Sequence, residues 1–226
     1  MIKAIVFDLA GTLVYGEEDT ATEDKDEVFS RIMRENGYDV YYQEFKAARH
    51  LVFFVDYPRR RANTPEEFYA KVMERLEIPA DLRVAAELAQ KSAELERMKL
   101  FDDVVSTINA LKARGIKTAI LTTIPLWMFQ HVFEANHVKI DFICTAREAK
   151  AVKPNPKIYK CVLNTLQVKP EEALMVGDTP EIDITPPKKL GMKAVMLCRD
   201  EVREVKQADH IIHSLTELLN IIQETV

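Results

Sequence analysis

The sequence predicts an α/β protein with a doubly wound, mostly parallel sheet, a Rossmann-like core. From Leu100 onward, short apolar runs that favour strands alternate with amphipathic segments that favour helices. This order is typical of a parallel sheet with helices on both faces. Residues 2–7 form a nearly continuous apolar run, as expected of a strand covered on both faces. Polar residues follow three of the runs directly, at the strand ends where open α/β sheets place their functional groups.

The elements of this core follow one another at short intervals. The strands are expected at residues 2–7, 118–121, 142–144, 174–176, 194–197 and 211–212. The helices between them are expected at residues 104–114, 126–136 and 156–166. Ser214-Leu215-Thr216-Glu217 has the pattern of a capping box and predicts the start of a last helix.

The segment between the first strand and residue 98 has only helical spacing. Residues 28–36, 42–55, 64–76 and 81–98 predict four helices, and the acidic, turn-rich residues 16–27 predict a linker before them. Thr64, Pro65 and Glu67 suit the N-cap, the first turn and a capping box of the third helix. We therefore expect residues 1–16 and 98–226 to form the α/β core, and residues 17–97 to form an inserted all-helical cap domain.

Composition narrows the class of protein. The 226 residues can bury a substantial core, and the net charge of −5 disfavours nucleic-acid binding, which needs a concentrated basic face. No apolar run approaches the roughly 18 residues of a membrane span, and no signal peptide is evident, so a cytoplasmic protein is expected. Cys144, Cys161 and Cys198 are scattered and odd in number, which favours reduced, buried thiols.

Three aspartates follow apolar runs. Asp8 comes directly after residues 2–7, and Asp178 follows the run at residues 173–176, with Asp183 five positions further on. Carboxylates that meet at one sheet edge repel one another unless a hard cation lies among them, and Mg²⁺ suits such oxygen ligands. The pattern therefore indicates a Mg²⁺ site, although Asp183 could instead cap the helix that follows it.

Two further motifs place polar groups near the same edge. The run before Thr122 and Thr123 predicts a strand ending in hydroxyls, and Lys153-Pro154 fixes a lysine shortly before a helix. The hydroxyls could merely end a strand, and most lysines are solvated. A role in holding an anion is the functional alternative for both motifs.

Together these motifs resemble the haloacid dehalogenase-like hydrolase superfamily, in a phosphatase-type form with an inserted helical cap. Four elements match in order: Asp8-x-x-Gly11-Thr12, Thr122, Lys153-Pro154 and Gly177-Asp178-x4-Asp183. The resemblance implies that Asp8 is the catalytic nucleophile and that Thr122, Thr123 and Lys153 bind the phosphoryl group. It also implies that Asp8, Asp178 and Asp183 hold Mg²⁺.

One position departs from the pattern of that superfamily. Two residues after the nucleophile the family usually carries a second aspartate, a general acid and base, and this chain has Ala10. The backbone carbonyl of Ala10 can still be the metal ligand that the resemblance implies, but its side chain cannot carry a proton. Because positioned acid–base groups contribute roughly 10²–10⁴-fold, slow hydrolysis of alkyl esters is expected.

The function expected is Mg²⁺-dependent hydrolysis of small phosphorylated metabolites through an aspartyl-phosphate, with no nucleic-acid or membrane partner. The alternatives are a 2-haloacid dehalogenase, an enzyme similar to phosphonoacetaldehyde hydrolase with a Schiff-base lysine at Lys46 or Lys71, and a catalytically weak phosphate-binding regulatory protein. The physiological substrate and the oligomeric state stay open. Arg59-Arg60-Arg61 could recognise an anion, but a run of charge is more often a solvated face.

Overall fold

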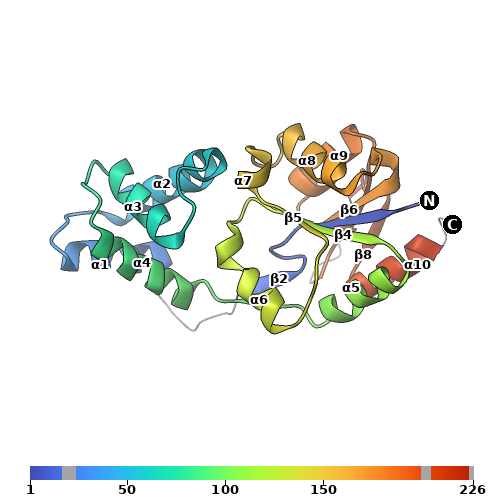
Figure 1. Cartoon of the computed structure of the whole chain (residues 1–226), viewed down its shortest axis with the longest axis horizontal. Helices are drawn as coiled ribbons and strands as arrows, with labels where there is room; N and C mark the ends of the chain where they lie inside the picture. The colour runs from blue at the N-terminus through green and yellow to red at the C-terminus, as the bar shows by residue number, and fades with distance from the viewer. Residues whose placement is uncertain (17–23, 200–204, 224–226) are drawn as a thin grey trace.

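A six-stranded parallel sheet forms the centre of the α/β part of the chain (Figure 1). The computed structural model describes residues 1–16, 24–199 and 205–223; most of the predicted linker lies outside them. The strand order is β5-β4-β1-β6-β7-β8. The bounds are β1 (Ala4–Phe7), β4 (Lys117–Leu121), β5 (Phe142–Cys144), β6 (Ala173–Gly177), β7 (Lys193–Leu197) and β8 (His210–Ile212). The predicted fold class is confirmed.

Helices cover both faces of this sheet (Figure 1). Alternate residues of β1 show why: Ile5 and Phe7 pack in one apolar cluster, and Ala4 and Val6 pack in another. The first cluster includes α5 (Val104–Ala113), α6 (Gln130–Ala135) and α10 (Leu218–Gln223). The second includes α8 (Pro156–Leu166), and α7 (Ala146–Ala149) and α9 (Thr185–Lys189) lie on the same side. A strand that is apolar on both faces is therefore buried on both, as the sequence predicts.

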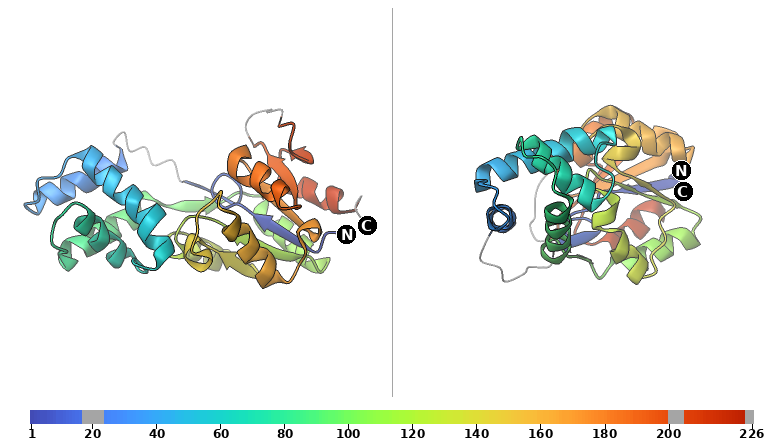
Figure 2. Two further views of the ribbon diagram at one scale, coloured as in Figure 1. Left: turned by 90° about the horizontal axis from the view of Figure 1, so that it is seen from above. Right: turned by 60° about the vertical axis from the view of Figure 1, so that its left-hand side comes forward.

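Four helices between β2 and β3 form a second body, here called the helical insertion. They are α1 (Lys25–Glu35), α2 (Tyr42–Leu51), α3 (Pro65–Arg75) and α4 (Leu82–Leu95). The α2 helix continues as a π-turn at Val52–Asp56 and a 3₁₀ turn at Tyr57–Arg59. These helices bury their own apolar cluster, and they lie at the opposite end of the molecule from the C-terminus (Figure 2).

A buried ion-pair network joins the helices of the insertion. The guanidinium of Arg49 donates to Asp26 at 2.6 and 3.2 Å and to Glu96 at 3.0 Å. The same guanidinium lies 5.6 Å from the ring centre of Phe29. Because each charge is paired, the network adds specific links between α1, α2 and the end of α4 without an unpaired buried charge.

Several expected details were wrong. Met98 does not end a helix: β3 (Met98–Leu100) pairs antiparallel with β2 (Val14–Gly16), which the sequence did not reveal. The single helix expected over residues 126–136 is divided into a 3₁₀ turn at Leu126–Met128 and α6. The cap expected at Thr64 is present, since its hydroxyl accepts from the backbone N–H of Glu67 at 3.2 Å, but the carboxylate of Glu67 bonds to the backbone N–H of Asn63, one residue earlier, at 2.7 Å.

Two aromatic residues connect the helical insertion with the core. Tyr57 is buried, and its hydroxyl lies 3.0 Å from the hydroxyl of Thr145 at the start of α7. The ring of Trp127 lies edge-on to Phe68 of the insertion, at 5.9 Å. Among the described residues, none of the helices combines the length and the apolar character that a membrane crossing requires.

Candidate active site

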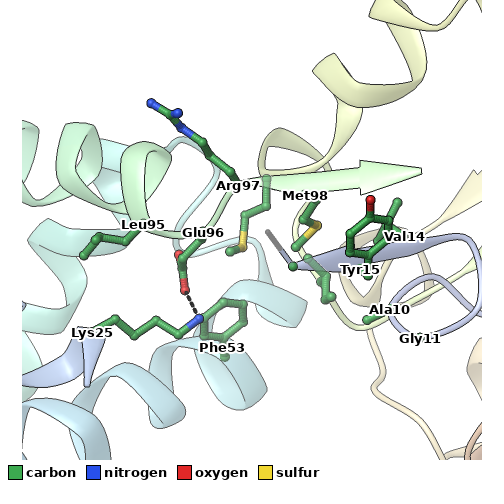
Figure 3. A pocket seen from close by; sticks show the side chains of 13 residues that line it. Ala10, Gly11, Val14, Tyr15, Lys25, Phe53, Leu95, Glu96, Arg97 and Met98 are labelled. Carbon is green, nitrogen blue, oxygen red and sulfur yellow. Dashed lines mark ion pairs between the residues drawn. The ribbon is translucent and has the colours of Figure 1, made fainter. Parts of the chain in front are cut away.

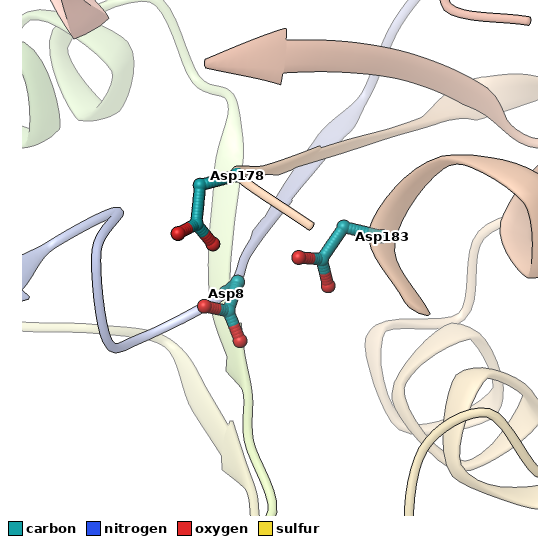
Figure 4. Close-up of side chains that lie close together, drawn as sticks. All are labelled: Asp8, Asp178 and Asp183. Atoms are coloured by element: carbon teal, nitrogen blue, oxygen red, sulfur yellow. The ribbon is translucent and has the colours of Figure 1, made fainter. Parts of the chain in front are cut away.

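Three carboxylates meet at the carboxyl end of the parallel strands. The β1 and β6 strands are neighbours, with Phe7 opposite Val176, so Asp8 and Asp178 leave the sheet side by side. Asp183 returns to them through the π-turn at Pro180–Ile184. Each of the three aspartates offers an oxygen within 4.8 Å of the others (Figure 4).

Lys153 supplies the positive charge within this group. Its ammonium donates to Asp183 at 2.9 Å and also bonds to Asp8. Only 2% of the lysine side chain is exposed. This burial favours a lysine that binds an anion over a solvated lysine. Asp183 also accepts from the backbone N–H of Thr179 at 3.2 Å, and this second bond holds its carboxylate in place beside Lys153.

The electrostatics of the cluster leave an excess of negative charge. Burial, together with the charge of Asp8, raises the pKa of Asp178 and raises that of Asp183 to about 7. Burial opposes the charge of Lys153, but Asp8 and Asp183 outweigh it and raise the pKa of that ammonium. Three carboxylates against one ammonium would leave two negative charges, a balance that a divalent cation with oxygen ligands restores. The residues present therefore fit Mg²⁺.

Two glycines allow the carboxylates to come this close. A Cβ on Gly11 would lie 2.3 Å from Oδ2 of Asp178, and the φ of Gly11 is +77°, in the region that favours glycine. A Cβ on Gly177 would lie 2.4 Å from Cγ of Asp183, whose side chain is fully buried. The packing of the site therefore requires a glycine at positions 11 and 177, both of which belong to the sequence motifs described above.

We expect Gly177→Ala to destabilise the protein and to weaken Mg²⁺ binding, because the added methyl displaces Asp183. Forcing a methyl group into a packed interior costs about 1–3 kcal/mol. Thermal unfolding with and without Mg²⁺ measures both effects. Gly16→Ala is the matched control for unfolding, because its added Cβ would meet no atom within 4 Å. Equal midpoints for the two variants would contradict the packing argument.

Thr122 lies at the end of β4, the strand beside β1. Its side chain is buried, and its hydroxyl oxygen accepts from the backbone N–H of Ile124 at 3.1 Å. The oxygen is thereby fixed in position while its own proton can be donated. Thr123 follows, half-buried. The structure places both hydroxyls beyond the strand end, as the sequence predicts.

Ala10 is exposed and borders a cavity of about 340 Å³ between the core and the helical insertion (Figure 3). The cavity reaches from Ala10 and Tyr15 to the paired side chains of Lys25 and Glu96, whose charged atoms are 3.3 Å apart. At position 10 the chain therefore presents a methyl group, and no carboxylate, to this cavity.

The triple arginine of the insertion divides into different environments. Arg61 lies 3.7 Å from the buried carboxylate of Asp56, which also accepts two bonds of 2.8 Å from Arg75. Arg59 and Arg60 are exposed. Arg61 therefore forms an ion pair within the insertion, and the other two arginines lie on a solvated face.

The Schiff-base alternative finds little support in the positions of its two lysines. Lys46 bonds to the hydroxyl of Tyr42 at 2.8 Å, and Lys71 is paired with Glu74. Neither of them lines the cavity at Ala10.

The sequence did not single out Tyr159 of α8. Its hydroxyl donates to the backbone carbonyl of Ile182, the residue before Asp183. This bond ties α8 to the π-turn that carries the third carboxylate. The only signal for it was the apolar face of α8, on which a tyrosine looks like any other core aromatic residue.

A family comparison agrees with this geometry. Residues 2–191 match the model for haloacid dehalogenase-like hydrolases, and the chain belongs to this family. The expected family and the expected class of enzyme, a hydrolase, are confirmed.

Relatives that are similar over nearly the full length are named as phosphatases. A glyceraldehyde 3-phosphate phosphatase of Methanocaldococcus jannaschii is 25% identical over 99% of this chain and 98% of its own. One of Pyrococcus furiosus is 28% identical over 98% of this chain and 93% of its own. A solved phosphatase of the family from Thermococcus onnurineus has a TM-score of 0.68 at 25% identity, covering 98% of both chains.

Solved dehalogenases share the fold as well. A 2-haloacid dehalogenase of Pseudomonas syringae has a TM-score of 0.73 and covers both chains fully. Its identity of 19% shows a common fold alone. The choice between the two chemistries therefore depends on the residues of the site.

Proposed function

We propose that this chain is a Mg²⁺-dependent phosphatase of small phosphorylated metabolites that works through an aspartyl-phosphate at Asp8. The observation that carries the proposal is the direct contact of Asp8 with the buried ammonium of Lys153, within reach of Asp178 and Asp183. The names of the full-length relatives support a phosphorylated substrate. A displacement of halide would have no need of the two additional carboxylates.

In the first step a carboxylate oxygen of Asp8 attacks phosphorus, and the bond from phosphorus to the leaving oxygen breaks. Lys153 pairs with Asp8 and lies where it can neutralise a phosphoryl oxygen, and the Thr122 hydroxyl can donate to another. Such positioning and charge neutralisation provide most of the catalysis in phosphoryl transfer. Bound Mg²⁺, held by Asp8, Asp178, Asp183 and the Ala10 carbonyl, would supply further neutralisation of the phosphoryl charge.

In the second step water hydrolyses the aspartyl-phosphate, which releases phosphate and frees Asp8. The side chain of Ala10 can neither take a proton from this water nor give one to the leaving oxygen in the first step. Leaving groups that depart as anions are therefore favoured.

We further propose that residues 17–97 act as a cap over the site. The cap would control which substrates reach Asp8, and two observations support this role. The insertion has its own apolar cluster, and it forms one wall of the cavity at Ala10. Residues 1–16 and 98–226 would then form the catalytic core.

We expect Ala10→Asp to raise the turnover of alkyl phosphates by about 10–100-fold, within the range of acid–base catalysis. The exposed position leaves room for the new carboxylate. The gain should be smaller for aryl phosphates, whose leaving groups need less protonation. Steady-state kinetics on an alkyl and an aryl ester, with and without Mg²⁺, measure the difference.

Ala10→Asn is the matched control, because it adds a side chain of similar size that cannot transfer a proton. A gain with asparagine equal to that with aspartate would contradict proton transfer at this position. Release of halide from a 2-haloacid without Mg²⁺, in place of phosphate release, would identify a dehalogenase.

A further inference from the structure

The cavity beside Ala10 has mainly apolar walls. Val14 and Ile124 line it from the core side, and Phe53 and Leu95 line it from the helical insertion. Figure 3 shows Phe53 and Ala10 on different sides of this space. A cavity of roughly 150 Å³ already accepts benzene, so about 340 Å³ accommodates a ring with its substituents.

The charged groups at the border of the cavity are already paired or turned aside. Glu96 is bound by Lys25 at 3.3 Å and by Arg49 at 3.0 Å. In Figure 3 the guanidinium of Arg97 points away from Ala10 and Tyr15. A small polyhydroxylated substrate would lose hydrogen bonds to water on entering such a space, and polar groups buried without partners are costly.

The cavity selects a leaving group by its size and polarity, and Ala10 selects it by the stability of the anion that departs. Without a proton donor at this position, the oxygen that leaves phosphorus has to depart as a stable anion. Carboxylates and phenolates do this, and ordinary alkoxides do not. The shape of the cavity and the chemistry at its edge therefore favour the same compounds.

We propose that the cavity binds the leaving group of an acyl or aryl phosphate with a ring-sized apolar body. This substrate class refines the phosphatase function proposed above and rests on it. During the reaction Asp8 forms a bond to phosphorus, and the bond from phosphorus to the acyl or aryl oxygen breaks. The carboxylate or phenolate then leaves from the cavity, and water hydrolyses the aspartyl-phosphate at Asp8 to release phosphate.

Benzoyl phosphate and acetyl phosphate test the proposal. Their leaving carboxylates are of similar acidity, so the two compounds differ mainly in the apolar ring. We expect kcat/KM of the wild-type protein with Mg²⁺ to be about 10–100-fold higher for benzoyl phosphate, because the ring is removed from water. Equal values for the two compounds would overturn the proposal while leaving the phosphatase function intact. Hydrolysis of neither compound would also overturn this substrate class, whereas the phosphatase function itself is decided by phosphate release from the alkyl and aryl esters.

Gly16→Leu tests whether the preference for benzoyl phosphate over acetyl phosphate arises in this cavity. Gly16 lines the cavity, and a Cβ built on it would meet no atom within 4 Å, so the leucine can fill the space. We expect the ratio of kcat/KM for benzoyl phosphate over acetyl phosphate to fall at least about fivefold, since part of the apolar burial is lost. An unchanged ratio in a variant with wild-type thermal unfolding would overturn the proposed location. If the variant fails to fold, the wild-type ratio still decides the substrate class.

Discussion

Asp8→Asn is expected to abolish turnover, with a fall in kcat of more than about 10⁴-fold, as is usual when an essential nucleophile is removed. The asparagine keeps the size of the side chain but is a poor nucleophile. It also removes the charge that Lys153 contacts at the end of β1. Phosphate release from an aryl phosphate in the presence of Mg²⁺ measures the effect.

The matched control for this loss is Asp102→Asn, which makes the same chemical change at an exposed position outside the cluster. Its kcat should stay within about twofold of the wild type, because substitutions of exposed residues away from a site have small effects. Substantial hydrolysis by purified Asp8→Asn protein would refute the mechanism. A similar loss in both variants would indicate a general effect of charge.

Lys153→Met is expected to have the second largest effect. The loss of one positioned charge at a phosphoryl group should lower kcat by about 10²–10³-fold. Without Mg²⁺ the variant should also be destabilised by about 3–5 kcal/mol, the cost of leaving buried carboxylates without their partner. Because a divalent cation can replace the missing charge, Mg²⁺ should raise the unfolding temperature of this variant more than that of the wild type.

Lys188→Met is the control for the loss of an ion pair as such. Lys188 bonds to Asp209, but 34% and 30% of the two side chains are exposed. A pair of this kind contributes at most about 1 kcal/mol. A Lys153→Met variant that matches it in both stability and activity would show that the lysine at the site is an ordinary surface charge.

The strands of the core were predictable because each is a short apolar run, and polar residues follow the runs that lead to the site. The run before Asp8 and the run before Asp178 lie side by side in the sheet, so a rule about strand ends was enough to bring the two carboxylates together. The β2–β3 pair was missed for a physical reason. Both strands have three residues, and a glycine in β2 and a lysine in β3 interrupt the apolar run that revealed the short strand at residues 142–144. Alternation between two faces cannot be recognised over so short a length.

The contacts within the site were less accessible to sequence reasoning. The resemblance gave Lys153 a role, but its simultaneous bonds to Asp8 and Asp183 depend on how three distant segments pack. The cavity at Ala10 is likewise formed by side chains from both the insertion and the core. Such features arise from tertiary packing, which a local pattern of residues does not contain.

The most direct measurement is reduction of the protein by borohydride during turnover, since an aspartyl-phosphate is reduced to homoserine and a free aspartate is not. Peptide mass spectrometry then identifies the modified position, with Asp8→Asn protein as the control. We expect homoserine at position 8 only when substrate and Mg²⁺ are both present. Steady phosphate release with no homoserine at position 8, or with homoserine at another aspartate, would contradict the proposed mechanism.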